Sequence, residues 1–224
     1  MDRGKPGTVV VNQAGRRFLN ETASYHLFGH AMMEAHRREP CIPAYLIADR
    51  RALYAYGLGM VRPGGHGLRK FLSEGYLVEG QTIDELAQKL AIDPVGLRAS
   101  VDQINQAAES GIDPEFGRGT TLYQRNLGDP SIGPNPTLGR IEQAPFYAVR
   151  LYPGDIGASC GLVTDENACV LDGGDKPIPG LYAVGNDMNS VMGGTYPAPG
   201  ITLGPALAFA YSAVQHALHQ PISP

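Results

Sequence analysis

The chain has 224 residues, of which 43% are hydrophobic and 18% are charged, and its formal net charge is −4. This composition is sufficient for one large core or two small ones. The weakly acidic charge and the lack of a long basic block argue against nucleic acid as a partner. No apolar run approaches the roughly 20 residues of a transmembrane helix, so no transmembrane segment is expected.

The three cysteines, Cys41, Cys160 and Cys169, are widely separated along the chain. Such spacing suits a reducing compartment better than a disulfide framework, and it matches no Cys/His metal motif. The first residues, Met-Asp-Arg-Gly-Lys-Pro, are not followed by the apolar core of a secretion signal. We therefore expect a cytoplasmic protein without a bound metal.

Residues 7–21 are expected to form a β-hairpin, because two extended runs flank the turn-forming residues from Asn12 to Gly15. Arg17, Asn20 and Glu21 follow this turn. Two interpretations of these polar residues are equally open. They could hold the hairpin through local hydrogen bonds, or they could contact a ligand.

Residues 23–38 are predicted to form a helix, because apolar residues recur there at helical spacing. His26 and His30 lie four residues apart and share a face of this helix. A metal site would need further ligands, and none stands out nearby in the sequence, so these histidines are expected to be solvated or packed. Leu27, Ala31 and Ala35 are expected to share one face of this helix.

The middle of the chain is predicted to alternate short strands and helices. The residues from Thr82 to Glu85 form a capping box, which starts a helix that reaches about Leu90. Asp93, followed by a proline, starts a longer helix that ends at Gly111. The other expected elements are strands at 44–48 and 76–79 and a short helix at 68–74.

Residues 111–144 are rich in Gly, Pro, Asp and Asn and are expected to be irregular, as functional segments of compact domains often are. A strand is predicted next at 145–152, followed by a hairpin of 161–165 with 168–171. No dinucleotide-binding fingerprint is found. The glycines near 57–59 lack both the third glycine and the strand-to-helix context.

The most informative stretch runs from Gly180 to Ala213. Its apolar run, Leu181 to Val184, predicts a buried strand, and a loop of small residues then leads into a helix at 203–219. The start of such a helix can seat a polar, electron-rich ligand edge, although the same pattern also occurs in ordinary strand-to-helix connections. The apolar residues of the helix are Leu203, Leu207, Ala210, Val214 and Leu218.

Four strings in this stretch resemble the C-terminal flavin-binding segment of FAD-dependent 3-ketosteroid dehydrogenases, which belong to the fumarate reductase and succinate dehydrogenase flavoprotein superfamily. They are Gly-Leu-Tyr-Ala-Val-Gly-Asn at 180–186, Ser-Val-Met-Gly at 190–193, Thr-Tyr-Pro-Ala-Pro-Gly at 195–200 and Thr-Leu-Gly-Pro-Ala at 202–206. Together these strings are far more specific than a single glycine motif.

The resemblance implies an α/β protein with FAD as its cofactor. Residues 1–144 would form an α+β cap, or substrate, domain, and residues 145–224 would form the C-terminal part of a Rossmann-like FAD-binding domain. The N-terminal βαβ unit that binds the pyrophosphate in this family has no counterpart here. We therefore expect a fragment or a chain whose other half is supplied separately, with uncovered sheet edges and apolar faces that promote self-association.

The resemblance also implies roles for individual residues. Tyr196 would donate a hydrogen bond to the ketone oxygen of a steroid-like substrate, assisted by the backbone N–H of Gly200. Tyr25, which follows the Arg-Arg-Phe-Leu-Asn-Glu string at 16–21, would accept the α-proton with help from a partner in the missing half. The alternatives are a turn tyrosine packed against prolines for Tyr196 and a helix-surface or core tyrosine for Tyr25. The expected cofactor-binding residues are Gly185, Asn186, Thr202 and Leu203.

Three functions are compatible with these patterns. The first is dehydrogenation of a 3-ketosteroid next to its carbonyl, at the Δ1 or the Δ4 position, with hydride transfer to FAD once the missing half is supplied. The second is a fumarate reductase-like activity. The presence of Tyr196 and the lack of arginine from 151 to 224 argue against it, because a dicarboxylate needs a cationic clamp. The third is an inactive truncated fragment.

Overall fold

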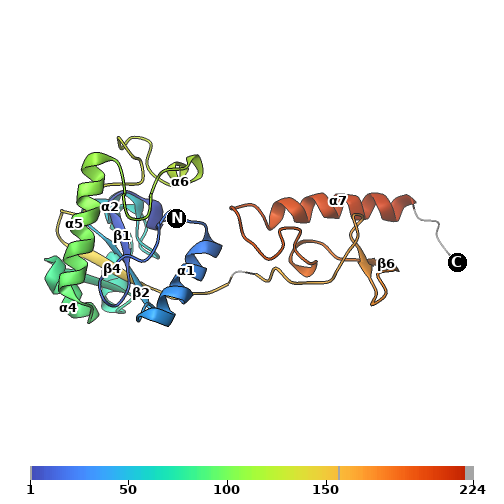
Figure 1. Cartoon of the computed structure of the whole chain (residues 1–224), viewed down its shortest axis with the longest axis horizontal. Coiled ribbons are helices and arrows are strands. Elements are labelled where there is room, and N and C mark those ends of the chain that lie inside the picture. The colour runs from blue at the N-terminus through green and yellow to red at the C-terminus, as the bar shows by residue number, and fades with distance from the viewer. Residues whose placement is uncertain (1, 156, 220–224) are drawn as a thin grey trace. The chain divides into compact units, whose positions relative to one another are not determined.

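The computed structural model describes residues 2–155 and 157–219 (Figure 1). The chain divides into two compact units, which we treat separately. The first unit comprises Met1–Ala23 with Leu27–Pro153, and the second comprises Ser24–His26 with Gly154–Pro224. The assignment of 1–144 to a cap domain and of 145–224 to an FAD-binding domain stays a prediction.

The first unit is built around a four-stranded sheet whose strands occur in the order β1-β2-β4-β3 and pair antiparallel throughout. The registers are specific: Leu46 lies opposite Val10 on one neighbouring strand and opposite Val149 on the other. The strands predicted at 44–48, 76–79 and 145–152 are confirmed with small shifts at their ends. The strand bounds are Thr8–Val11 for β1, Ala44–Ala48 for β2, Leu77–Gly80 for β3 and Phe146–Leu151 for β4.

Helices cover both faces of this sheet, so its strands are apolar on both sides (Figure 1). Alternate residues such as Val9 and Ile47 pack with α4 and α5 on one face. Their neighbours Val10 and Leu46 pack with α1 and α2 on the other. The helices are α1 (Tyr25–Arg38), α2 (Arg50–Tyr56), α3 (Leu68–Ser73), α4 (Ile83–Leu90), α5 (Pro94–Ser110) and α6 (Leu122–Asn126), with 3-10 turns η1 (Asp2–Gly4) and η2 (Pro63–Gly65).

The predicted helix caps are confirmed at α4 and α5. The hydroxyl of Thr82 accepts a hydrogen bond from the backbone N–H of Glu85, and the Glu85 carboxylate accepts one from Gln81. The carboxylate of Asp93 caps the start of α5, and Gly111 ends this helix in the left-handed conformation. Local sequence therefore determines the ends of these two helices.

One prediction for the N-terminal region is wrong. The segment 7–21 is not a hairpin: β1 pairs with β2, and no strand forms from 16 to 21. The turn at Asn12 does exist, because its side chain accepts hydrogen bonds from the backbone of Ala14 and Arg16. Of the apolar residues of α1, Leu27 is 59% exposed, whereas Phe28 and Met32 are buried.

A buried cluster of charges occupies the place where a second hairpin strand was expected. The Arg17 guanidinium lies between the carboxylates of Glu21 and Asp113, with N–O distances of 2.9 and 2.8 Å, and the side chains of all three are at most 1% exposed. Arg118, also fully buried, lies 3.5 Å from Glu21 and donates a hydrogen bond to the Thr8 carbonyl. These bonds join β1 to the segment 111–144, which was expected to be irregular but contains the short helix α6. They favour a structural role for Arg17 and Glu21.

The pKa values in this cluster follow from burial and from the neighbouring charges. Burial alone raises the pKa of Asp113, but the hydrogen bonds and positive charge of Arg17 outweigh it, so the pKa lies below its usual range. Burial lowers the pKa of Arg17, but hydrogen bonding to Asp113 and the charge of Glu21 more than compensate and raise it. Both groups are therefore ionised in the folded chain at neutral pH.

The second unit has much less secondary structure. Strands β5 (Cys169–Leu171) and β6 (Pro177–Tyr182) form an antiparallel ribbon, followed by the 3-10 turn η3 (Gly185–Asp187) and by α7 (Leu203–His219). The predicted hairpin of 161–165 with 168–171 is reduced to a single bridge between Thr164 and Val170, because β5 pairs with β6 instead. The helix predicted at 203–219 is confirmed at both ends.

The strand expected at 181–184 is not buried. The strand β6 ends at Tyr182, and Leu181 is 43% exposed. The core of the unit is small, consisting of Val170, Ala183 and Met188 with the partly buried Phe209. A two-stranded ribbon cannot bury both of its faces, so Leu181 remains accessible to solvent while Ala183 is buried.

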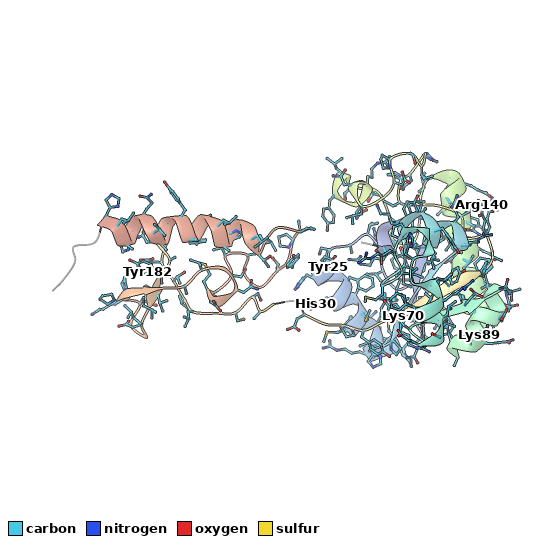
Figure 2. All side chains as sticks on the ribbon, turned by 180° about the vertical axis from the view of Figure 1, so that it is seen from behind. Tyr25, His30, Lys70, Lys89, Arg140 and Tyr182 are labelled. Atoms are coloured by element: carbon cyan, nitrogen blue, oxygen red, sulfur yellow. The ribbon has the colours of Figure 1, made fainter. Side chains whose placement is uncertain are left out.

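A polar clamp joins the ribbon to α7. The hydroxyl of Tyr182 lies 2.9 Å from Nδ1 of His216, and the Cys169 Sγ lies 3.4 Å from the same nitrogen. Tyr182 is labelled on the ribbon beside this helix in Figure 2. Burial raises the pKa of the Cys169 thiol, and the carboxylate of Asp165 raises it further. The clamp is therefore formed by a thiol and not by a thiolate.

One side of α7 is an exposed apolar stripe. Its five large side chains are each 57% to 74% exposed, although their spacing is that of a buried helix face. No helix in residues 2–155 and 157–219 is both long and apolar enough to cross a bilayer. An exposed stripe of this kind is typical of an interaction surface. The stripe consists of Leu203, Leu207, Tyr211, Val214 and Leu218.

Removing one partner from the buried charge cluster is expected to destabilise the first unit strongly. Asp113→Asn removes one of the two carboxylates that balance the buried positive charge of Arg17. It should lower the free energy of unfolding by about 3 kcal/mol at pH 7. Because the native pKa of Asp113 is lowered, its contribution is present above about pH 4 and is lost as the pH falls further. Urea unfolding at pH 7 and pH 3 should therefore show a smaller acid-induced loss in the variant. The control is Asp84→Asn, which removes an exposed ion pair with Arg98 and should cost less than about 1 kcal/mol.

The apolar stripe of α7 is expected to drive self-association of the chain. Introducing charge at two largely exposed positions, Leu207→Glu with Leu218→Glu, should shift the sedimentation coefficient toward that of a monomer at high protein concentration. Gln215→Glu, on the same helix but outside the stripe, adds charge without removing apolar surface and should leave association unchanged. Equal association of the double variant and the unsubstituted chain would contradict the prediction.

Candidate active site

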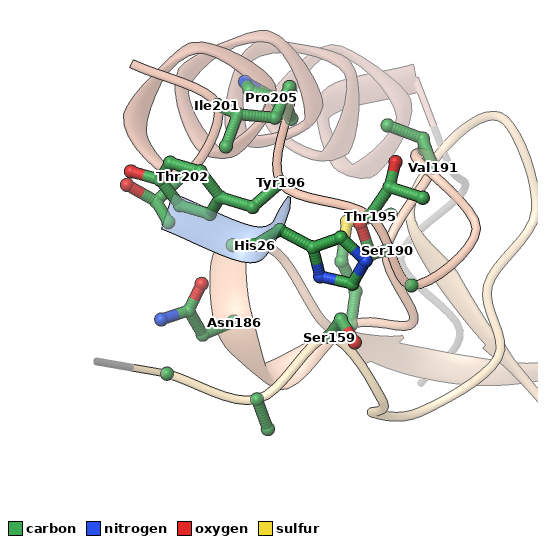
Figure 3. A pocket seen from close by; sticks show the side chains of 15 residues that line it. His26, Ser159, Asn186, Ser190, Val191, Thr195, Tyr196, Ile201, Thr202 and Pro205 are labelled. Carbon is green, nitrogen blue, oxygen red and sulfur yellow. The ribbon is translucent and has the colours of Figure 1, made fainter. Parts of the chain in front are cut away.

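A pocket in the second unit collects most of the residues that sequence analysis singled out. Its cavity has a volume of about 150 Å³ (Figure 3). The lining comes from four segments, namely His26, residues 157–159, the residues around η3, and the loop from Ser190 to Pro205 at the start of α7. The site is therefore assembled from segments that are distant in the sequence.

Backbone hydrogen bonds hold these segments together. The N–H of Ser190 donates to the Ser159 carbonyl at 2.9 Å, and the N–H of Leu162 donates to the Asp187 carbonyl at 2.9 Å. The hydroxyl of Thr195 donates to the Met192 carbonyl at 2.8 Å, which closes the loop on itself. The residues from 157 to 162 and the loop after η3 are therefore held side by side by backbone hydrogen bonds.

The predicted residues are brought together only in part. Gly185, Asn186, Thr202 and Tyr196 all line the pocket, whereas Gly200 and Leu203 are not among its lining residues. The Tyr25 ring lies edge-on to the Tyr196 ring, with 6.2 Å between their centroids and 78° between their planes. The roles assigned to these residues stay predictions.

Gly200 occupies a backbone position that favours glycine. Its φ of +96° lies in the left-handed region, which side chains with a Cβ avoid. Its carbonyl accepts a hydrogen bond from the N–H of Gly204 at 2.8 Å, at the beginning of α7. This glycine therefore sets the direction of the chain between Tyr196 and the helix.

Sequence analysis missed several lining residues, most importantly His26. It was expected to be solvated or packed, but its imidazole projects into the pocket near Ser159 and Thr195 (Figure 3). The available signal was its position directly after Tyr25, although a lone histidine on a helix is usually not functional. Among the lining residues there is no Asp, Glu, Lys or Arg.

The residues present fit a flat, polar cofactor edge. Small residues form much of the wall, and a Cβ added at Gly157 would lie 2.6 Å from the Asn186 amide nitrogen. The N–H groups at the start of α7, next to Thr202, can donate hydrogen bonds to electron-rich oxygens and nitrogens. Throughout the part of the chain that the structure describes, no group of three or more His, Cys, Asp or Glu side chains is placed to hold a metal ion.

Comparisons with known proteins identify the family of this chain. The family model described as "FAD binding domain" matches residues 1–203. A 3-oxosteroid 1-dehydrogenase from Mycolicibacterium smegmatis is 39% identical over 217 residues, which cover 95% of this chain and 38% of that protein. A 4-oxocyclohex-2-ene-1-carboxylate 5-dehydrogenase from Sinomonas cyclohexanicum is 40% identical over 210 residues, which cover 94% of this chain and 36% of that protein.

A solved structure is also similar. The 3-ketosteroid Δ1-dehydrogenase from Sterolibacterium denitrificans, in complex with 1,4-androstadiene-3,17-dione, matches with a TM-score of 0.88 and 43% identity over 96% of this chain and 39% of that one. An NADH:fumarate oxidoreductase from Klebsiella pneumoniae is more distant, at 27% identity over 188 residues, which cover 84% of this chain and 17% of that protein. The chain thus spans less than half the length of each of these relatives. The chain belongs to the FAD-binding domain family of flavoproteins, and within it resembles the 3-ketosteroid dehydrogenases more than the fumarate reductases.

Proposed function

We propose that the chain carries part of the active site of an FAD-dependent dehydrogenase, which oxidises a 3-ketosteroid next to its carbonyl. The observation that carries this proposal is the pocket itself. Tyr196, the expected donor to the ketone oxygen, shares one cavity with Asn186 and Thr202, which are expected to contact the flavin. Tyr25 packs against Tyr196, so both proposed reacting side chains belong to one cluster.

In this proposal each residue acts on one part of the substrate. The hydroxyl of Tyr196 and the backbone N–H of Gly200 donate hydrogen bonds to the ketone oxygen, which stabilises the charge that develops there. The phenolic oxygen of Tyr25 would receive the proton from the α-carbon while its own hydroxyl proton passes to a basic partner in the missing half. When bound, FAD supplies an acceptor for the hydride of the β-carbon. Dehydrogenation at Δ1 and at Δ4 are both compatible with these roles.

We propose that this chain holds only one part of FAD. Gly185, Asn186, Thr202 and Leu203 would contact the ring system and ribitol, where small residues allow close approach of the backbone. The adenosine and pyrophosphate would be bound by a dinucleotide-binding unit outside these 224 residues. The partial match to the length of the relatives supports this division.

A fumarate reductase-like activity fits the site less well. A dicarboxylate is normally held by arginine side chains, and no arginine is present from 151 to 224. The loop that would carry the clamp presents Tyr196 to the pocket instead. A neutral ketone is better matched to a phenolic donor.

A second candidate substrate is a small ring ketone of the kind named for the Sinomonas relative. The 40% identity of that relative over 94% of this chain favours it. Both candidates place a cyclohexanone-type ring against Tyr196.

We propose the cytoplasm as the location of the protein. All three cysteines are free, and two of them, Cys41 and Cys169, are buried. Burial raises the pKa of the Cys41 thiol to about 11, with a further contribution from Glu39, so this thiol resists oxidation. Recovery of the native protein with the soluble cytoplasmic fraction of its host would support the proposal, and recovery outside the cell would overturn it.

The proposed function predicts flavin binding and dependence on Tyr196. After incubation with excess FAD and desalting, the chain should retain absorbance in the flavin bands, alone or with its dinucleotide-binding unit. With that unit present, Tyr196→Phe should lower kcat for a 3-ketosteroid roughly 100-fold or more, because one oxyanion-hole donor is lost. Flavin absorbance should be unchanged in this variant.

The matched control is Tyr211→Phe, because Tyr211 is an exposed tyrosine of α7 that does not line the pocket. This control should keep full activity. Equal turnover by Tyr196→Phe and the unsubstituted enzyme would refute the assignment of Tyr196. Failure of the complete assembly to retain flavin would refute the proposed function as a whole.

A further inference from the structure

The loop that carries Tyr196 is only weakly held by packing. Residues 191–195 are exposed, and Gly193 and Gly194 have φ angles of +60° and +84°, which glycine adopts more readily than other residues. The small core of this unit is built from other segments of the chain. Hydrogen bonds must therefore supply most of what fixes the position of this loop.

Two hydroxyl side chains bind the backbone of one residue in this loop, Met192. Its N–H donates to the Oγ of Ser190 at 3.2 Å, and its carbonyl accepts a hydrogen bond from the hydroxyl of Thr195 at 2.8 Å. The N–H of Thr195 donates to the same carbonyl at 3.2 Å, and the N–H of Gly193 donates to the Ser190 carbonyl at 3.1 Å. Residues 190–195 therefore form a turn that is closed from both ends.

This turn connects the body of the unit to Tyr196. At its beginning, the N–H of Ser190 donates to the Ser159 carbonyl at 2.9 Å, which ties the turn to the opposite side of the pocket. At its end, Thr195 directly precedes Tyr196 in the chain. A change in the backbone at Thr195 therefore moves the phenolic ring of Tyr196.

The hydroxyl of Thr195 is better suited to hold the loop than to donate to a ligand. Thr195 lines the pocket together with Ser190, and Figure 3 shows both residues in the pocket wall. A hydroxyl group has one proton to donate, and that of Thr195 is bonded to the Met192 carbonyl. The proposed reaction assigns no role to this side chain.

We propose that Thr195 is a positioning residue, which holds Tyr196 in place for its hydrogen bond to the ketone oxygen by tying the loop to the Met192 carbonyl. This inference rests on the proposed function, because it assumes that Tyr196 is the donor. It deepens that function by naming the residue that fixes the donor. A misplacement of about 1 Å can cost roughly 100-fold in rate, so one hydrogen bond in an exposed loop is enough to affect turnover.

The first test measures the loop itself, on the purified chain, by amide hydrogen exchange observed by NMR. Thr195→Val removes the hydroxyl with little change of shape, whereas Thr195→Ser keeps it. We expect the N–H at position 195, corrected for its intrinsic rate, to exchange about tenfold faster in Thr195→Val. In Thr195→Ser the rate should stay within about twofold of the unsubstituted chain, because the hydrogen bond is retained.

The second test measures turnover of a 3-ketosteroid by the complete assembly with FAD and the dinucleotide-binding unit. Thr195→Val should lower kcat about tenfold and leave KM nearly unchanged, because the contact that is weakened acts in the transition state. Thr195→Ser should restore kcat. In the Tyr196→Phe background, Thr195→Val should have no further effect, because the hydroxyl that it positions is already absent.

The matched control is Thr120→Val in the first unit. The Thr120 hydroxyl also donates to a carbonyl three residues earlier, that of Gly117 at 2.9 Å, but it lies outside the pocket lining. This variant loses the same kind of hydrogen bond and should keep full kcat. Flavin absorbance should be the same in all variants, which shows that each one still folds and binds the cofactor.

The outcomes distinguish this inference from the proposed function. Unchanged amide exchange in Thr195→Val would refute the role of Thr195 in holding the loop. If Tyr196→Phe lowers kcat but Thr195→Val does not, or lowers it equally in both backgrounds, the positioning role is refuted while the proposed function stands. If Tyr196→Phe keeps full kcat, the assignment of Tyr196 and the role of Thr195 are both refuted.

Discussion

The salt bridges between buried Arg17 and the carboxylates of Glu21 and Asp113 are the interaction on which the N-terminal region depends. Glu21 is only four residues before Tyr25, so the cluster also anchors the chain where α1 begins. Charges as deeply buried as these are tolerated only when each has a partner. These bonds therefore take the place of the expected hairpin in the first unit.

The two units differ in how much of their apolar surface they cover. In the first unit, helices pack on both faces of the sheet, and the strand residues of β1 and β2 are nearly all inaccessible to solvent. In the second, a two-stranded ribbon and one helix share a core of four side chains. The candidate site lies in the second unit, so its precision depends on backbone hydrogen bonds within loops more than on close packing.

The pocket combines features that suit ketone chemistry without any strongly charged side chain. Tyr196 can donate to a carbonyl oxygen, small residues admit a flat ring system, and the start of α7 supplies N–H groups. Because the lining contains no lysine or arginine, the pocket attracts dianions only weakly.

Much of this protein could be predicted from local sequence, because the responsible interactions are local. The caps at Thr82 and Asp93, the strand at 44–48 and the helix at 203–219 follow from hydrogen bonds and periodicity within a few residues. Strand pairing could not be predicted in the same way. The segment after Asn12 looked like the partner of β1, but β2 pairs with β1 instead. The residues of β2 are apolar on both faces and pack into the core on each side of the sheet.

The sequence by itself determined the family, since the four strings from Gly180 to Ala206 require no knowledge of contacts, and it also named Tyr196, Asn186 and Thr202. Only the tertiary structure decided that these residues share one cavity, that Leu203 lies outside its lining, and that His26 lines it. The physical reason is that a pocket is defined by residues far apart in the chain. Their proximity arises from the hydrogen bonds and packing of the whole unit, which no local pattern encodes.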